Sequence, residues 1–164
     1  MIRAITSFGY VGLAPVAPGT FGSLAALPVG YGLHVLGGFP LLALATLAIW
    51  PLGIWATTRL TADQDDKDPS EVVIDEVLGQ WIALLPLSLG LWHVGAAATV
   101  FPWPGWVGAF ALFRLFDIWK PGPIGWADRM HTPFGTMLDD VFAGLAAALC
   151  VALAAGIAHG VMGL

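Results

Sequence analysis

The stretch Asp68-Pro-Ser-Glu-Val-Val-Ile-Asp-Glu-Val-Leu-Gly79 determines how the rest of the chain is interpreted. Its first residues have the pattern of a helix start, with Asp68 as the cap, Pro69 at the first helical position and Glu71 completing a capping box. Asp75 and Glu76 follow one turn deeper, and no Asp, Glu, Lys or Arg comes after them until Arg114. Unpaired anions are costly in so apolar an environment, so we expect positive charge to meet this acid pair.

The composition predicts an integral membrane protein. The 164 residues are 58% hydrophobic and 10% charged, whereas a soluble domain has about 25% charged residues. The intervals 4–58, 77–113 and 141–164 contain no Asp, Glu, Lys or Arg, and a membrane-spanning helix needs only about 20 apolar residues. The length fits a single membrane-embedded domain, residues 1–164.

Glycine and proline positions divide these intervals into helices. Residues 7–23 contain too many of both to span a membrane, so we expect a loop at the membrane face. The break at Gly37-Gly38-Phe39-Pro40 predicts a hairpin of two helices. We therefore predict an all-α membrane protein, a compact bundle of about five transmembrane or partly inserted helices, at 24–36, 41–59, 69–100, 106–120 and 137 to the C-terminus.

The same division predicts the topology. Two crossings separate the N-terminal loop from residues 59–76, and two more separate that segment from residues 114–140. Since an even number of crossings returns the chain to the same side, all six Lys and Arg residues are expected on one face, together with every Asp and Glu. The positive-inside rule makes that face cytoplasmic.

Three groups of acids then converge on this face: Asp75 with Glu76, Asp117, and Asp139 with Asp140. The two pairs lie in the first turns of helices, and Gly79 and Gly144 follow a turn later, where they allow close helix approach. Clustered carboxylates without nearby His or Cys favour Mg²⁺, Mn²⁺ or Ca²⁺.

Basic residues in the same region suit a phosphate group. Arg114, Lys120 and Arg129 are close in sequence to the acids, and helix N-termini at Pro69 and Met137 would add positive dipole ends. Carboxylates, a divalent metal and basic residues at a membrane surface indicate phosphoryl chemistry on a lipid headgroup.

Structural interpretations of some of these residues remain open. Glu71 and Asp139 are also typical helix caps, and Arg114 with Asp117 could form a buried ion pair. The acids of segment 63–68 are interpreted as a solvated loop. A small cation transporter is an alternative function, although acids confined to one face leave no polar path across the membrane. No nucleic-acid partner is expected.

Four blocks extend over nearly the whole chain: Pro18-Gly-Thr-Phe-Gly-Ser-Leu-Ala-Ala26, Val73-Ile-Asp-Glu-Val-Leu-Gly79, Phe113-Arg-Leu-Phe-Asp-Ile-Trp-Lys-Pro-Gly-Pro-Ile124 and Gly135-Thr-Met-Leu-Asp-Asp-Val-Phe-Ala-Gly144. In their order and spacing these blocks resemble the bacterial phosphatidylglycerophosphatase A family. The resemblance implies a Mg²⁺-dependent, multi-pass phosphatase of the bacterial inner membrane with its active site facing the cytoplasm. It would convert phosphatidylglycerophosphate into phosphatidylglycerol. The residues themselves indicate a metal and a phosphorylated lipid, and the glycerol headgroup comes from the resemblance alone.

With that resemblance, each candidate residue receives an expected role. Asp75, Glu76, Asp139 and Asp140 would hold Mg²⁺, and one of them or Asp117 would orient or deprotonate the attacking water. Arg114 and Lys120 would stabilise the phosphoryl oxygens. Donors from the loop at Gly19, Thr20 and Ser23, and the side chain of Arg129, would contact the headgroup. Acyl chains would lie between helices that are open to the bilayer. Phosphatases of a polyprenyl phosphate or phosphatidate remain alternatives, and the sequence does not predict the oligomeric state.

Overall fold

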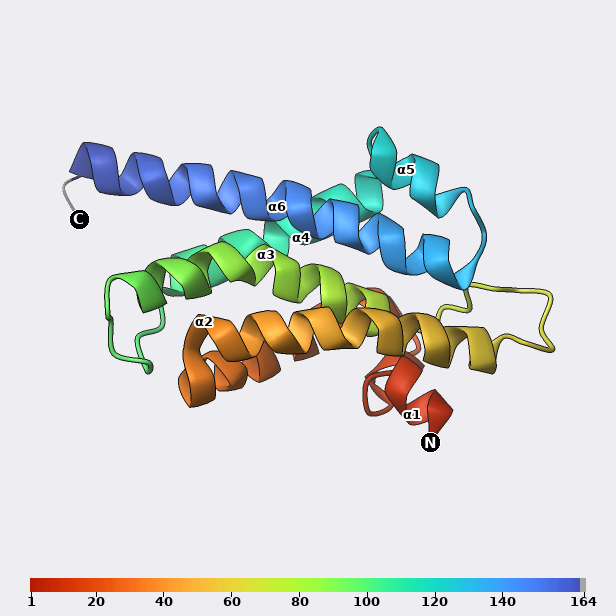
Figure 1. Ribbon diagram of the computed structural model, residues 1–164. Coiled ribbons are helices and arrows are strands. Elements are labelled where there is room, and N and C mark those ends of the chain that lie inside the picture. Colours follow the sequence, from red (N-terminus) through yellow and green to blue (C-terminus); the bar gives the residue numbers. More distant parts are fainter. Residues whose placement is uncertain (163–164) are drawn as a thin grey trace.

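The computed structural model describes the backbone of residues 1–162 and the side chains up to residue 158. Its elements are helical throughout this range (Figure 1). In chain order they are α1 (Ile2–Thr6), the 3-10 turn η1 (Val11–Leu13), α2 (Pro18–Leu60), α3 (Ile74–His93), α4 (Trp103–Trp119), α5 (Pro123–Asp128) and α6 (Pro133–Met162). The predicted all-α fold is confirmed.

The long helix α2 is broken in its middle. Gly38 has φ 64° and ψ −158°, a conformation that residues with a side chain rarely adopt, and Gly37 is also outside the helical region. The chain reverses there, so the two halves of α2 run in opposite directions (Figure 1). The hairpin predicted at 37–40 is therefore present.

Three helices are long and apolar enough to cross a membrane: Pro18–Leu60, Ile74–His93 and Pro133–Ala158. Because α2 reverses at Gly37–Gly38, it consists of two stretches that run in opposite directions. The 17 residues of α4 give a length of about 26 Å, slightly less than the roughly 30 Å hydrocarbon core of a bilayer.

Charged and apolar segments occupy opposite ends of this bundle. One end holds α1, the loop of residues 61–73, α5 and the beginning of α6 (right side of Figure 1). The other end holds the turn of α2, the loop of residues 94–102 and the end of α6. Every Asp, Glu, Lys and Arg belongs to the segments at the first end, to the end of α2, to the start of α3 or to the end of α4, as the count of crossings predicts.

Helix α3 is at the centre, since it packs against α2, α4 and α6. All residues from Ile74 to Leu84 are buried except Glu76, which is partly buried. The acidic start of α3 is thereby fixed in the middle of the charged end of the bundle.

Two glycines let α3 and α6 touch backbone to backbone. A Cβ atom at Gly144 would lie 2.5 Å from the carbonyl oxygen of Gly79, and one at Gly79 would lie 2.7 Å from the carbonyl oxygen of Asp140. Both helices start at the charged end and run in the same direction (Figure 1). The acids one turn before each glycine are therefore brought together, as their spacing predicts.

The predicted start of α3 at Pro69 is wrong. The helix begins at Ile74, because the N–H of Val73 donates a hydrogen bond to the carbonyl of Thr6 (2.9 Å) instead of entering a helical turn. Glu71 does not cap the helix either; it forms an ion pair with Arg3 at the protein surface. These contacts tie the segment before α3 to α1.

Other boundaries also differ from the prediction. Helix α2 begins at Pro18 rather than at residue 24, with Ala17 in a left-handed conformation before the proline. Helix α3 ends at His93, and α6 begins at Pro133 instead of Met137. The short helix α5 lies where the sequence predicts only a polar loop.

Candidate active site

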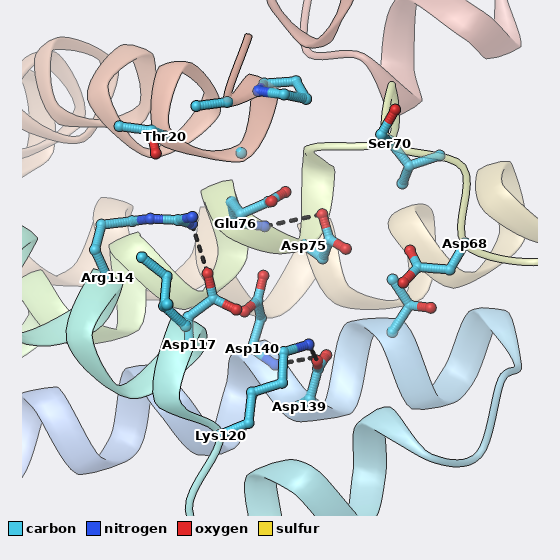
Figure 2. Close-up of a pocket in the computed structure, with 16 residues that line it drawn as sticks. Thr20, Asp68, Ser70, Asp75, Glu76, Arg114, Asp117, Lys120, Asp139 and Asp140 are labelled. Atoms are coloured by element: carbon cyan, nitrogen blue, oxygen red, sulfur yellow. Dashed lines mark hydrogen bonds and ion pairs between the residues drawn. The ribbon is translucent and has the colours of Figure 1, made fainter.

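A cavity of about 460 Å³ opens where the N-terminal ends of α2, α3 and α6 meet the C-terminal end of α4 (Figure 2). Its charged lining comes from four separate segments of the chain. Six carboxylates and two cations line it: Asp68, Asp75, Glu76, Asp117, Asp139, Asp140, Arg114 and Lys120. The structure thus unites the three acid groups that the sequence predicts to converge.

The carboxylates form two overlapping clusters. Oxygens of Asp75, Glu76 and Asp140 lie within 4.8 Å of one another, and so do those of Asp117, Asp139 and Asp140. Asp140 belongs to both clusters and is only 3% exposed. In Figure 2 the side chains of Asp117 and Asp140 point toward each other beneath Asp75 and Glu76.

Helix α4 supplies both cations, each paired with an acid. Arg114 Nη1 lies 2.6 Å from Asp117 Oδ2 and donates to Ser23 Oγ at 3.3 Å. Lys120 Nζ donates to Asp139 Oδ2 at 2.7 Å and to the carboxylate of Asp128. The Arg114–Asp117 ion pair, which the sequence left open as a structural alternative, is present, and both residues line the cavity.

Lys120 reaches its partners from an unusual backbone conformation. It ends α4 with φ 49° and ψ 51°, the left-handed region, which costs about 1–2 kcal/mol for a residue with a side chain. Burial disfavours its charge, but hydrogen bonds to Asp128 and Asp139 outweigh burial and raise the pKa of Lys120 above its usual value. Lys120 is therefore a fixed cation at neutral pH.

The acids of α3 have no such partner. In the described part of the chain, no Lys or Arg lies within ion-pair distance of Asp75 or Glu76. Asp75 Oδ1 accepts only the backbone N–H of Glu76, at 3.0 Å. Glu76 Oε2 and Asp140 Oδ1 are buried without any hydrogen-bond partner. These carboxyl groups therefore lie together at the centre of the cavity without an ion pair to any described Lys or Arg.

A divalent cation fits these residues. The cavity offers hard oxygen donors, and no His or Cys is among the described residues that line it, which is the donor set of Mg²⁺, Mn²⁺ or Ca²⁺. With more carboxylates than cations, the site would also repel a phosphate unless protons or a metal compensated it. The orphan oxygens of Glu76 and Asp140 are suitable ligands.

The predicted headgroup loop is the first turn of α2. Gly19 lies directly against Glu76, since a Cβ atom there would collide with Glu76 Oε1. The N–H of Thr20 donates to the carbonyl of Ala17 at 3.0 Å, so only the Thr20 hydroxyl remains for a ligand. Ser23 is fully buried and does not line the cavity, but its hydroxyl accepts from Arg114.

Two predicted residues, Ser23 and Arg129, do not line the cavity, and three residues that do line it were missed. Arg129 is exposed at the end of α5 and does not line the cavity. Asp68, Ser70 and Thr136 do line it. The position of Thr136, four residues before Asp140 on α6, could have indicated it, because residues at this spacing share a helix face.

The sequence matches a known family over most of its length. The family model of phosphatidylglycerophosphatase A matches residues 4–155, which include every residue of the cavity. The chain belongs to this family. No solved structure matches it.

Individual relatives agree with the family model. Phosphatidylglycerophosphatase A of Escherichia coli is 37% identical over 139 residues, which cover 84% of this chain and 73% of that protein. The Haemophilus influenzae protein of the same name is 38% identical over 141 residues, covering 85% and 80%. A Bacteroides thetaiotaomicron protein provisionally named phosphatidylinositol-3-phosphatase is 37% identical over 156 residues, covering 91% and 89%.

Proposed function

We propose that this member of the phosphatidylglycerophosphatase A family hydrolyses the terminal phosphomonoester of phosphatidylglycerophosphate, releasing phosphate and leaving phosphatidylglycerol in the membrane. The names of the E. coli and H. influenzae relatives support this substrate. The observation that carries the proposal is an acid-lined cavity with two cations at the charged end of a membrane bundle, where a lipid headgroup would lie.

Magnesium is part of the proposal. Asp75, Glu76 and Asp140 would hold the ion, and Asp139 lies in the adjoining carboxylate cluster. When bound, Mg²⁺ supplies positive charge for the phosphoryl oxygens and favours ionisation of water. The lack of an ion pair at the α3 acids within the described residues supports this role.

The remaining residues act on the substrate and the water. Arg114 and Lys120 donate hydrogen bonds to the non-bridging phosphoryl oxygens, on which charge increases in the transition state. Asp117 or Asp139 accepts a proton from the attacking water. The water oxygen bonds to phosphorus, the bond from phosphorus to the glycerol oxygen breaks, and that oxygen takes up a proton to become a hydroxyl.

The substrate and metal are tested by phosphate release from purified lipids. We expect turnover of phosphatidylglycerophosphate that EDTA abolishes and Mg²⁺ restores. The panel also contains phosphatidylinositol-3-phosphate, phosphatidate and a polyprenyl phosphate, because the B. thetaiotaomicron relative favours a phosphoinositide as the second candidate substrate. Preferential hydrolysis of another lipid would refute the substrate, and full activity after exhaustive chelation would refute the metal.

We also propose that the protein lies in the bacterial inner membrane with the cavity facing the cytoplasm. The gathering of all six Lys and Arg residues at the cavity end supports this orientation. In a Cys150→Ala background, cysteines introduced near Asp66 and near Trp126 should react with a membrane-impermeant reagent only from the cytoplasmic side. An Ala97→Cys variant, in the loop at the other end, should react only from the opposite side. Labelling of the first two from different sides would contradict the topology.

A further inference from the structure

A second cavity, of about 300 Å³, is lined entirely by apolar and aromatic residues: Leu27, Pro28, Tyr31, Phe101 and Trp106. The rings of Tyr31, Phe101 and Trp106 contact one another, with centroids 5.1 to 5.6 Å apart. The Tyr31 hydroxyl donates to the carbonyl of Thr99 at 2.9 Å, which ties the loop before α4 to α2. The three rings therefore form a fixed wall at the far end of this cavity.

The two cavities are built from the same pair of helices. Helix α2 gives Gly19 and Thr20 to the acid-lined cavity and Leu27 and Tyr31 to the apolar one. Helix α4 gives Arg114 to the first cavity and Trp106 to the second, in the opposite chain direction. The boundary between α2 and α4, called the seam below, thus runs from the acid-lined cavity at one end to the aromatic wall at the other.

Apolar side chains occupy the seam between the cavities. Thr20, Leu24, Leu27 and Tyr31 are spaced by four, three and four residues, so they form one stripe along α2. Leu24 is 43% exposed in this stripe. On α4, Val107 is exposed seven residues before Arg114, a spacing that also keeps one helix face.

The length of the seam matches one acyl chain. Thr20 and Tyr31 are eleven residues apart on α2, which is about 16 Å at the rise of an α-helix. One leaflet of a bilayer has a hydrocarbon depth of about 15 Å, half of the roughly 30 Å core. A chain that starts at a headgroup in the acid-lined cavity therefore ends near the aromatic wall.

We propose that the seam between α2 and α4 binds one acyl chain of the phospholipid whose phosphate occupies the acid-lined cavity, with the chain end against Tyr31, Phe101 and Trp106. This inference rests on the proposed function and specifies how the lipid is held. Binding along the seam fixes the direction from which the headgroup enters and positions the phosphorus beside Arg114. The aromatic wall makes hydrolysis depend on acyl-chain length.

The effect on affinity should be graded rather than absolute. Lipid tails are as apolar as the seam, so binding there gains packing contacts and not the transfer of apolar surface out of water. A chain that fills the seam should be favoured over one that ends short of the wall. The measured quantity is therefore the ratio of kcat/KM for a long-chain substrate to that for a short-chain one.

Leu27→Trp tests the seam by placing a large side chain about halfway along it, where it should block the acyl chain. In mixed micelles, we expect the long-to-short ratio for phosphatidylglycerophosphate to fall about tenfold, equivalent to about 1.4 kcal/mol. Leu47→Trp is the matched control, because Leu47 is 66% exposed on the other half of α2, and the ratio should stay at its wild-type value. An unchanged ratio in Leu27→Trp, or the same fall in Leu47→Trp, would overturn the inference.

A crosslinking experiment on the wild-type protein separates the inference from the proposed function. Phosphatidylglycerophosphate carrying a diazirine near the end of one acyl chain should label Tyr31, Phe101 or Trp106, and excess unlabelled lipid should prevent it. Labelling spread over the lipid-facing surface of the second half of α2 would refute the acyl-chain site even if hydrolysis is normal. Specific labelling without hydrolysis would retain the site and refute the proposed function.

Discussion

The beginnings of α3 and α6 are alike in geometry and opposite in electrostatics. Each helix starts at the charged end with two adjacent acids, and each has a glycine four residues after one of them, Gly79 after Asp75 and Gly144 after Asp140. On α6, Asp139 is held by Lys120 at 2.7 Å. On α3, neither acid has a cation in the described part of the chain.

This difference separates two uses of the same sequence pattern. On α6, Lys120 compensates the charge of Asp139, and this ion pair fixes the positions of both side chains in the site. In the described part of the chain the acids of α3 form no ion pair, and the proposed Mg²⁺ would supply positive charge there. Asp140, shared by both carboxylate clusters, links the two halves.

The largest expected effect comes from the uncompensated acids and their shared partner. Asp75→Asn and Asp140→Asn each remove one charge while nearly preserving shape. If these residues hold Mg²⁺, phosphate release should fall at least about a hundredfold, because losing a ligand weakens both metal affinity and substrate alignment.

Asp65→Asn is the control for charge alone, since Asp65 is exposed in the loop before α3. It should retain near-normal turnover. Folded Asp75→Asn protein with wild-type turnover would show that the α3 acids, despite lacking a cation, are not part of the catalytic site.

Lys120→Met should have the next largest effect, a loss of about ten- to a hundredfold in kcat, since it removes a donor to the phosphoryl group. Its effect on the Mg²⁺ concentration needed for half-maximal activity should be smaller than that of Asp75→Asn. Arg129→Gln removes a cation that does not line the cavity and should be nearly silent. An equal shift in Mg²⁺ requirement for Lys120→Met and Asp75→Asn would erase the distinction between the two helix starts.

Gly144→Ala disturbs the close contact between α3 and α6 that brings the acids at the beginnings of the two helices together. Its Cβ atom would meet the backbone of Gly79, which cannot move as a flexible side chain can, so we expect a loss of about 1–3 kcal/mol in the free energy of unfolding. Gly156→Ala on the same helix meets nothing within 4 Å and should be neutral or slightly stabilising. Thermal unfolding in detergent measures both, and equal stability of the two variants would contradict the close approach.

Sequence reasoning succeeded where the cause is local. The acids at 75–76 and 139–140 with their following glycines, and the break at Gly37–Gly38, are patterns within single helices. The even number of crossings placed all charges at one end because it depends only on counting apolar stretches. These features together predicted both the fold and most of the cavity.

Sequence reasoning failed where distant residues compete with a local signal. The capping pattern at Asp68-Pro-Ser-Glu71 is genuine in sequence, but Arg3 pairs with Glu71 and Thr6 accepts the N–H of Val73, so the helix starts later. Asp68, interpreted as solvated beyond a capping role, lines the cavity because of the path of that loop. No sequence pattern within the loop distinguishes Asp68 from the neighbouring acids Asp63, Asp65 and Asp66.

The smallest expected effect is a change in thermal stability. It compares the two helices most directly, because removing an acid at the beginning of α3 and removing one at the beginning of α6 should shift the unfolding midpoint in opposite directions. In metal-free protein, Asp75→Asn relieves repulsion among clustered carboxylates and loses no ion pair, so the midpoint of thermal unfolding should rise by about 1–3 °C. Asp139→Asn also removes a carboxylate, but it leaves Lys120 with Asp128 alone, and breaking a partly buried pair is destabilising. Its midpoint should fall by a few degrees. With saturating Mg²⁺, the unfolding midpoint of Asp75→Asn should instead lie below that of the wild type. Only the wild type retains the full set of ligands, so only the wild type gains the full stabilisation from metal binding. Two variants that shift in the same direction without metal would mean that Asp75 is as well compensated as Asp139, and the case for a bound cation would rest on the proximity of the carboxylates alone.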